Sequence, residues 1–189
     1  IDHDSVSLSN LNRQILFTED DISKMKVIAA RDRLKKLNSD ISIKAITEKF
    51  DMNFNSSFLK DYDIVIDCTD NFETRSLINK FSISNKIPLI TGAALKFEGQ
   101  VAIFRNDLDN MPCYRCLYAN LPNTTNACID SGILGSVTGI VGTLLATECI
   151  KLICKFGKRF ESMLFLMDLK NNNYKTIKIN KDEKCKYCR

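Results

Sequence analysis

The amino-acid sequence predicts an α/β protein with a doubly wound, mostly parallel sheet, a C-terminal antiparallel hairpin and a structural zinc site. Three observations support this fold class. Strand-like and helix-like patterns alternate up to Thr91, which is typical of parallel sheets whose strands are joined by helices. Two later strand-like segments flank Asn171 and Asn172, as in a hairpin. Two Cys-x-x-Cys pairs, Cys113–Cys116 and Cys185–Cys188, are spaced as zinc ligands are.

The composition is that of an ordinary globular protein. The chain has 189 residues, of which 44% are hydrophobic and 26% charged, and this length suits one domain. The net charge is +4 and the basic residues are scattered, so charge gives no reason to expect a nucleic-acid partner. The apolar run from Ile133 to Leu145 is shorter than the ~20 residues that span a bilayer. With no visible signal peptide, we expect no membrane association and a reducing compartment such as the cytoplasm.

The first part of the chain is expected to hold a helix, a strand and a short irregular or helical segment. From Asp20 to Asn38, apolar side chains recur close to helical spacing, with acidic residues first and lysines last, as the helix dipole favours. Ile41 to Ile46 alternates like a strand, and the irregular segment runs to Leu59. The apolar positions of the helix are Ile22, Met25, Ala29, Leu34 and Leu37.

The middle of the chain predicts three strands and a helix. The run from Ile64 to Ile66 is long enough for a short buried strand, and a helix is expected from Phe72 to Asn85. Pro88 to Gly92 reads as another buried strand, and Gln100 to Phe104 as a further one.

The last part of the chain changes character. Asn106 to Asn126 is polar and contains two prolines, so we expect a long loop. A helix is predicted from Thr138 to Phe156, and the hairpin strands are Ser162 to Leu169 and Asn173 to Ile179. Three further cysteines are expected to be core residues: Cys68, Cys149 and Cys154.

The strand at Ile64 ends in a cluster of small polar and acidic residues. In an open parallel sheet, ligands collect beyond the carboxyl ends of the strands, so Asp67 and Asp70 predict a site for phosphate and metal. An alternative is that Thr69 or Asp70 caps the following helix, since Thr and Asp are favoured caps. Both roles can share Asp70, and Asp67 is expected to support the turn.

The four cysteines of the two pairs predict a zinc site. Zinc binds four thiolates at tetrahedral corners, and each Cys-x-x-Cys presents two of them from one tight turn. The two pairs lie far apart in sequence, so the fold must return the C-terminus to the loop. The alternatives are two unrelated thiol pairs, or a redox pair, although neither pair opens a helix after a strand as redox pairs normally do. The predicted ligands are Cys113, Cys116, Cys185 and Cys188.

Several polar residues near the start could bind a nucleotide. Asp2 would suit the acidic residue that binds ribose hydroxyls about 20 residues after a glycine-rich turn, or it is an ordinary surface carboxylate. Asn10, Arg13 and Lys26 offer donors for phosphate oxygens, and each could equally be a solvated surface group. Cys128 stands alone in the loop and is either an activated nucleophile or an inert thiol.

At this point a family resemblance is visible. The chain resembles the ubiquitin-activating-like adenylyltransferases of the ThiF/MoeB/HesA family over essentially all its length. The motifs that carry the resemblance occur in this order: SLSNLNRQILF, then Lys26, DCTDN, PCYRCL, the Cys128 region, GTLLATECIKL and the final CKYC. The resemblance implies a Rossmann-like sheet, zinc, a homodimer, a cytoplasmic enzyme, and ATP- and Mg²⁺-dependent adenylation. The substrate it implies is the Gly-Gly carboxylate of a ubiquitin-fold sulfur-carrier protein in molybdopterin, thiamine or related sulfur-transfer biosynthesis, with a sulfur donor as a further partner.

The resemblance also assigns roles to individual residues. Asp2 would hold the ribose, Asn10 and Arg13 would contact the triphosphate, and Lys26 would stabilise its developing charge. Asp70 would be the magnesium-linked carboxylate. The four paired cysteines match the family's zinc ligands, and Cys128 matches a cysteine that some members use for a covalent link to the carrier or for sulfur transfer.

The chain departs from the family pattern at its start. The glycine-rich phosphate loop and the first strand and helix are absent, and Ile1 stands where Met would begin a complete protein, so we expect an N-terminally truncated adenylation domain over residues 1–189. Ser136 stands where relatives often have Pro. Two alternative functions remain: a non-catalytic, partner-binding subunit of a heterodimeric activating enzyme, and a relative that adenylates modified tRNA.

Overall fold

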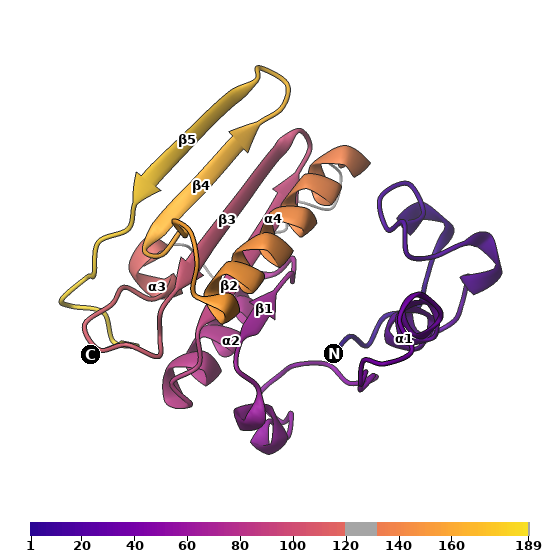
Figure 1. Cartoon of the computed structure of the whole chain (residues 1–189), viewed down its shortest axis with the longest axis horizontal. Helices are drawn as coiled ribbons and strands as arrows, with labels where there is room; N and C mark the ends of the chain where they lie inside the picture. The colour runs from indigo at the N-terminus through magenta and orange to yellow at the C-terminus, as the bar shows by residue number, and fades with distance from the viewer. Residues whose placement is uncertain (120–131, 189) are drawn as a thin grey trace. The chain divides into compact units, whose positions relative to one another are not determined.

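The computed structural model describes residues 1–119 and 132–188. The chain divides into two compact units, Ile1–Asn55 and Ser56–Arg189, which are described in turn below (Figure 1). The single adenylation domain expected over the whole chain stays a prediction.

The first unit contains one α-helix, α1 (Lys26–Leu37), preceded by two 3₁₀ turns, η1 (Leu8–Asn10) and η2 (Glu19–Asp21). The predicted start of the helix at Asp20 is therefore wrong. The acidic residues form only a short turn, and Ser23 then adopts a positive φ of 71°, which side-chain-bearing residues rarely populate and which interrupts a helix.

Residues on either side of this interruption bond to an earlier segment instead of to a helix. The N–H of Val6 donates to the carbonyl of Lys24 at 2.8 Å, and the N–H of Ser23 donates to the carbonyl of Val6 at 2.9 Å. An isolated antiparallel bridge joins Ser5 to Met25. The helix can therefore begin only after Met25.

The predicted strand from Ile41 to Ile46 is also wrong, because no strand is assigned there. The alternation of apolar residues is present, but a strand needs a ladder of backbone partners. The N–H of Asp2 donates to the carbonyl of Ile46 at 3.1 Å, and a single bond of this kind does not make a ladder.

The second unit is built around a five-stranded sheet in which the strands follow one another in chain order. Its strands are β1 (Val65–Asp67), β2 (Leu89–Leu95), β3 (Glu98–Phe104), β4 (Met163–Asp168) and β5 (Asn173–Lys178). Its helical segments are η3 (Ser57–Asp61), α2 (Phe72–Ser84), α3 (Tyr114–Leu117) and α4 (Gly135–Cys154). The α/β class and the C-terminal hairpin are confirmed.

Among the described strands the sheet is mixed rather than mostly parallel. β1 and β2 are parallel, whereas β2–β3, β3–β4 and β4–β5 are antiparallel. The reason is the connection after Leu95, where only Lys96 and Phe97 separate β2 from β3. Lys96 has a positive φ of 52°, and so short a link permits only an antiparallel pair, since a parallel pair needs a crossover of about a dozen residues or more.

α4 packs on one face of the sheet, as Figure 1 shows, mainly against β2 and β3. Glycines on these strands allow the close approach. A Cβ added at Gly92 would lie 2.7 Å from Cδ1 of Leu145, and one at Gly99 would lie 2.8 Å from Cγ2 of Val141. The buried core on this face consists of Ile90, Val101, Ile103, Val141, Leu145 and Met167.

The opposite face of the same strands meets the turn that carries the first cysteine pair. Side chains alternate along a strand, so Leu89 and Thr91 face away from α4. Phe104 is the register partner of Leu89, and its ring meets that of Tyr114 in α3 edge to face, with the centroids 5.9 Å apart. Cys113 caps α3 and Cys116 lies within it, so the first cysteine pair lies on this side of the sheet.

The predicted helices and hairpin of this unit are confirmed with small changes in their ends. α2 ends one residue early, and α4 begins at Gly135 and ends before Lys155, whose φ of 55° is left-handed. Two of the three cysteines expected in the core are exposed: Cys68 lies in the turn beyond β1, and Cys154 is the last residue of α4. Cys149 is half-buried.

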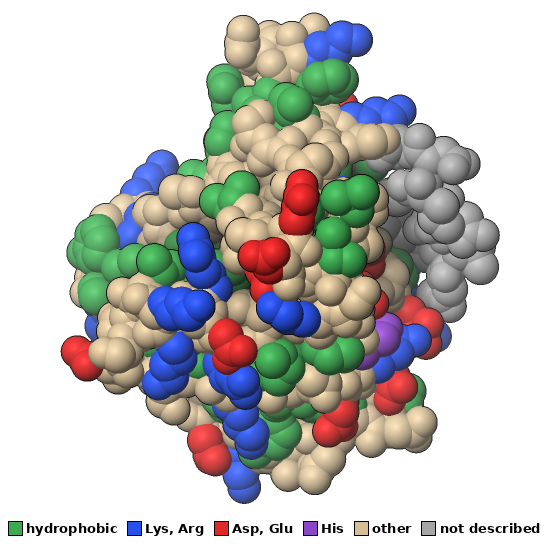
Figure 2. All heavy atoms as spheres, turned by 90° about the vertical axis from the view of Figure 1, so that its right-hand side faces the viewer, with side chains coloured by type: hydrophobic (Ala, Val, Ile, Leu, Met, Phe, Trp, Pro, Cys, Tyr) green, Lys and Arg blue, Asp and Glu red, His purple; other side chains and the backbone are tan. Residues whose placement is uncertain are grey.

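Two surface properties bear on the expected environment. Among the described helices, α4 has the length and apolar composition of a membrane-spanning helix, a test that core helices of soluble proteins also pass, and here α4 packs on the sheet. On the face shown in Figure 2, Lys and Arg side chains lie among Asp and Glu side chains. This agrees with the scattered charge of the sequence.

Candidate functional site

The turn that follows β1 is fixed by Asp67. This carboxylate is 1% exposed, and its Oδ1 accepts hydrogen bonds from the backbone N–H of Thr69 at 2.9 Å and from the hydroxyl of Thr69 at 2.8 Å. A buried carboxylate is tolerated when it is hydrogen-bonded. The prediction that Asp67 supports the turn is confirmed.

The helix that follows is capped by Asn71, so the prediction of a cap at Thr69 or Asp70 is wrong. The side-chain oxygen of Asn71 accepts from the N–H of Thr74 at 2.8 Å. Asn caps a helix as well as Asp does, and Asn71 directly precedes the first helical residue. Asp70 is exposed, and its carboxylate has no hydrogen bond or ion pair among the described residues.

Arg75, on α2, joins the turn after β1 to the middle of β2. Its side chain is buried, with 7% exposed, and its Nη2 donates to the carbonyl of Thr69, after β1, and to the carbonyl of Gly92, in β2, at 3.2 Å in the second case. Burial raises the pKa of the neighbouring Tyr114 to about 12, against the lowering effect of the Arg75 charge. With only 7% of Arg75 exposed, its guanidinium is largely shielded from solvent.

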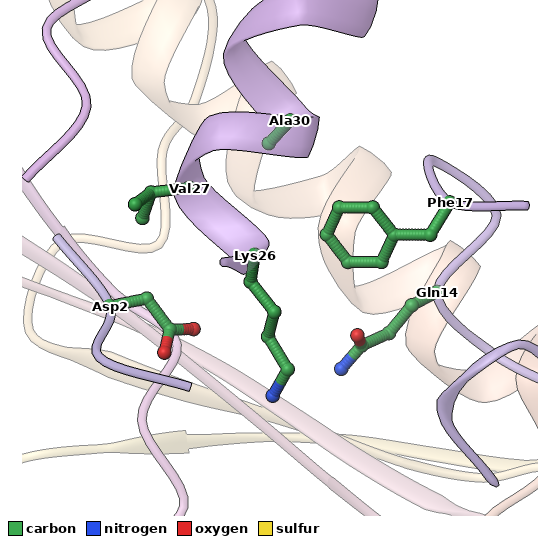
Figure 3. Close-up of a pocket in the computed structure, with 6 residues that line it drawn as sticks. All are labelled: Asp2, Gln14, Phe17, Lys26, Val27 and Ala30. Atoms are coloured by element: carbon green, nitrogen blue, oxygen red, sulfur yellow. The ribbon is translucent and has the colours of Figure 1, made fainter. Parts of the chain in front are cut away.

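The first unit contains an open pocket of about 180 Å³, shown in Figure 3. Asp2, Gln14 and Lys26 bring polar groups to it, and the other lining residues are Phe17, Val27 and Ala30. The structure thus brings Asp2 and Lys26, two of the predicted nucleotide residues, together in one pocket.

The polar groups of this pocket are oriented by local bonds. The Lys26 ammonium, whose side chain is 14% exposed, donates to Oδ2 of Asp4 at 2.8 Å, and this bond holds the pKa of Asp4 below its ordinary value. Oδ1 of Asp2 accepts from the N–H of Asp4 at 2.8 Å. Lys26 is the first residue of α1, so its position is set by the point where the helix begins.

Asn10 is the last residue of η1, Arg13 lies in the turn that follows it, and both make local hydrogen bonds. Oδ1 of Asn10 accepts from the N–H of Ser7 at 3.2 Å. Nη1 of Arg13 donates to the carbonyl of Ser9 and to Oδ1 of Asn12, at 2.9 Å each. These bonds hold both side chains close to the backbone of this segment.

The four predicted zinc ligands form one cluster, in which all four Sγ atoms lie within 4.8 Å of one another. The Sγ–Sγ distances are 3.8 Å for Cys113–Cys185, 4.0 Å for Cys113–Cys116 and 3.4 Å for Cys116–Cys188. A tetrahedral zinc with Zn–S bonds of about 2.3 Å requires edges of about 3.8 Å. The cluster therefore fits zinc, and it leaves no open coordination position.

The chemistry of the thiols agrees with a metal site. Burial, and then the nearby Cys116, raise the pKa of Cys113 to about 11, so this thiol keeps its proton at neutral pH unless a cation replaces it. The side chain of Asn79, which is fully buried, donates from Nδ2 to Sγ of Cys113 at 3.7 Å and accepts from the N–H of Tyr114 at 3.1 Å. Such outer contacts orient metal ligands.

A model of the ThiF family matches residues 1–187. The chain belongs to the ThiF family. It is 34% identical over 188 residues to the molybdopterin-synthase adenylyltransferase of Salmonella typhimurium, a match that covers 100% of this chain and 75% of that protein. It is 38% identical over 191 residues to the adenylyltransferase and sulfurtransferase MOCS3 of Culex quinquefasciatus, covering 100% of this chain and 43% of that protein.

A crystal structure of E. coli MccB with MccA-N7isoASN superposes with a TM-score of 0.84 at 22% identity, covering 99% of this chain and 58% of the MccB chain. At this identity the likeness shows the fold, and it supports the Rossmann-like α/β class. This ThiF-family chain thus spans three quarters of one relative, less than half of the other and somewhat over half of MccB.

Sequence reasoning missed three residues of this ThiF-family chain, which lie at the pocket, at the turn after β1 and at the cysteine cluster. Oε1 of Gln14 is buried beside the pocket without a described partner. Arg75 had a signal, because a basic residue near a helix N-terminus opposes the dipole and suggests a specific contact. No sequence signal pointed to Asn79, because the periodicity of a helix does not reveal which polar residue is buried beside a cysteine cluster. Cys128, the predicted nucleophile, lies outside the described residues.

Proposed function

We propose that this protein adenylates the C-terminal carboxylate of a ubiquitin-fold sulfur-carrier protein that ends in Gly-Gly. The observation that carries the proposal lies in the first unit of this ThiF-family chain. Asp2 and Lys26, assigned separately to the ribose and the phosphates of ATP, line the same pocket. The apolar side of that pocket, with Phe17, suits a nucleoside.

The proposed roles follow from the chemistry of each side chain. Asp2 binds the ribose hydroxyls, Asn10 and Arg13 contact the triphosphate, and Lys26 neutralises the charge that develops on it. Asp70 is the carboxylate linked to Mg²⁺. An exposed carboxylate without a described partner fits that ion, which prefers carboxylate and phosphate oxygens.

In the proposed reaction, a carboxylate oxygen of the carrier attacks the α-phosphorus of ATP. The new P–O bond forms as the bond to pyrophosphate breaks, which yields an acyl-adenylate and pyrophosphate. The attacking group is already ionised, so no general base is required. When bound, Mg²⁺ would offset phosphate charge, and the residues of the chain contribute positioning and charge neutralisation.

The zinc cluster has a structural role in this proposal. Four cysteines fill the coordination sphere, so the ion binds no substrate and instead ties the C-terminus to α3 and its N-cap residue, Cys113. We further infer a cytoplasmic homodimer and a separate sulfur donor, with the pathway set by the carrier that is adenylated. These features rest on the family resemblance.

Exchange of labelled pyrophosphate into ATP by the full-length protein tests the proposal. The sulfur carriers of the molybdopterin and thiamine pathways are added separately, so that the carrier is identified at the same time. Asp70→Asn should lower carrier-dependent exchange about 100-fold or more, as losses of transition-state electrostatics do.

The matched control is Asp63→Asn, another exposed carboxylate, located before β1, which should leave exchange unchanged. Absence of exchange with every carrier would refute the proposed activity and favour a non-catalytic, partner-binding subunit. Unchanged exchange in Asp70→Asn would refute only the role of Asp70.

A further inference from the structure

We propose that Arg75 is a positioning residue that fixes the direction of the Asp70 carboxylate for adenylation. This inference rests on the proposed function, because it assigns to Arg75 a part in the same reaction. The guanidinium bonds the carbonyl of Thr69, one residue before Asp70, and the carbonyl of Gly92 on the neighbouring strand. It therefore links the turn after the carboxyl end of β1 to the middle of β2.

The backbone before Asp70 is fixed from both sides. The N–H and the hydroxyl of Thr69 donate to the buried Asp67, and the carbonyl of Thr69 accepts from Arg75. Every polar group of Thr69 is thus engaged with a buried charged side chain.

The backbone after Asp70 is fixed by the start of α2. The side chain of Asn71 caps the helix through the N–H of Thr74, and the carbonyl of Asn71 accepts from the N–H of Arg75 at 3.2 Å. With both neighbours held, the remaining freedom of Asp70 is that of its own side chain. A carboxylate held in this way has less freedom to lose when it binds its ligand.

Placing an Arg at position 75 costs free energy of folding, which indicates that the residue has a specific role. Its charge is buried, which carries a desolvation penalty, and it lies in the first turns of α2, where the helix dipole disfavours a cation. The planar fork of Arg can reach two carbonyls on neighbouring strands at once. A Lys ammonium is a compact point charge on a flexible stem, and it would retain the charge while losing this rigid link.

The link has a direct consequence for the reaction. Displacement of a positioned group by about 1 Å can lower a rate about 10²-fold. Because Arg75 is proposed to act by positioning Asp70 and not by binding the nucleotide, its loss should lower the rate of the chemical step and leave ATP binding intact. We therefore expect an effect on kcat, with KM for ATP unchanged.

A double-mutant cycle with Arg75→Lys and Asp70→Asn tests this inference in the pyrophosphate exchange assay. Arg75→Lys should lower kcat about 10- to 100-fold without changing KM for ATP, and should have no further effect when Asp70→Asn is already present. Equal losses in both backgrounds would overturn the inference, because they would show that Arg75 does not act through Asp70. Arg75→Gln serves as the second variant where the Lys variant does not fold.

The matched control is Arg105→Lys, which alters a second largely buried Arg of the same unit that pairs with Asp107 and Glu161. It should lower stability and leave kcat of the folded protein unchanged. Hydrogen–deuterium exchange of the zinc-loaded protein supplies a readout that does not depend on activity. Arg75→Lys should speed amide exchange in residues 68–72 and not in β5.

If the wild-type protein catalyses no pyrophosphate exchange with any carrier, the proposed function fails. Hydrogen–deuterium exchange still tests whether Arg75 holds the backbone around Asp70. Unchanged protection of residues 68–72 in Arg75→Lys would then overturn this role of Arg75.

Discussion

Replacing Cys185 with Ser is expected to destabilise the protein strongly, because it removes one of four ligands from the zinc cluster. A zinc tie from Cys116 to Cys185 closes a loop of roughly 70 residues, and in the chain-entropy model a cross-link of that length stabilises the folded state by about 4 kcal/mol. For a chain of this size each kcal/mol shifts Tm by about 2–4 °C. Cys185→Ser should therefore lower Tm by about 8–16 °C.

The assay is thermal unfolding of the zinc-loaded protein, combined with a metal analysis that should give close to one zinc per chain. A chelator should lower the Tm of the wild type towards that of Cys185→Ser and should have little effect on the variant. The control is Cys154→Ser, an exposed thiol at the end of α4 outside the cluster, which should change neither zinc content nor Tm. A metal-free wild type with unchanged Tm would refute the argument, because the four sulfurs would then hold the C-terminus without an ion.

Two further predictions test contacts that position the zinc cluster and α4. Asn79→Ala removes the donor to Sγ of Cys113 and should weaken zinc affinity about 10- to 100-fold in competition with a chromophoric chelator; an unchanged affinity would show that this outer contact is dispensable. Gly92→Ala places a Cβ 2.7 Å from Leu145 and should cost about 1–3 kcal/mol in denaturant unfolding. Its control, Gly139→Ala on α4, meets no atom within 4 Å and should stabilise by up to about 1 kcal/mol, so a similar loss at both glycines would contradict the packing argument.

The sequence predicted those parts of the fold in which local pattern and tertiary context agree. The helix from Phe72 has helical periodicity and a capping residue before it. The hairpin has strand-like segments on both sides of turn-forming residues, Asn171 and Asn172. The convergence of the four paired cysteines on one cluster that fits zinc was predictable, because metal chemistry restricts both residue type and spacing.

The errors arise where a distant partner decides. Ile41 to Ile46 alternates like a strand, but a strand depends on a neighbour that periodicity does not reveal. The acidic residues from Asp20 suit a helix start, yet bonding of the following segment to Val6 delays the helix to Lys26. The sequence pattern did not reveal that β2 and β3 are antiparallel. Only two residues separate these strands, and so short a link decides their relative direction.

At the turn after β1, the sequence identified which residue types are present but not which structural role each of them has. Asp67, Asp70 and Asn71 are all polar residues that suit a strand end, and only the structure separates the support of the turn from the helix cap. That separation matters for function, because Oδ1 of Asp67 and the side-chain oxygen of Asn71 accept hydrogen bonds within the turn and at the helix start. Asp70 is the acidic residue of this turn that remains exposed.

Four buried polar residues of α2 connect the turn that carries Asp70 to the turn that carries the first cysteine pair. Thr74, Arg75, Asn79 and Ser82 are all buried, although apolar residues at these positions would cost less to bury. Arg75 contacts the turn that presents Asp70, and Asn79, one helical turn later, contacts the cysteine turn. A single rigid helix therefore sets the position of both sites. On this reasoning, loss of zinc should loosen the turn around Asp70 as well as the C-terminus, and faster amide exchange in residues 68–72 after chelation would be the evidence for that coupling.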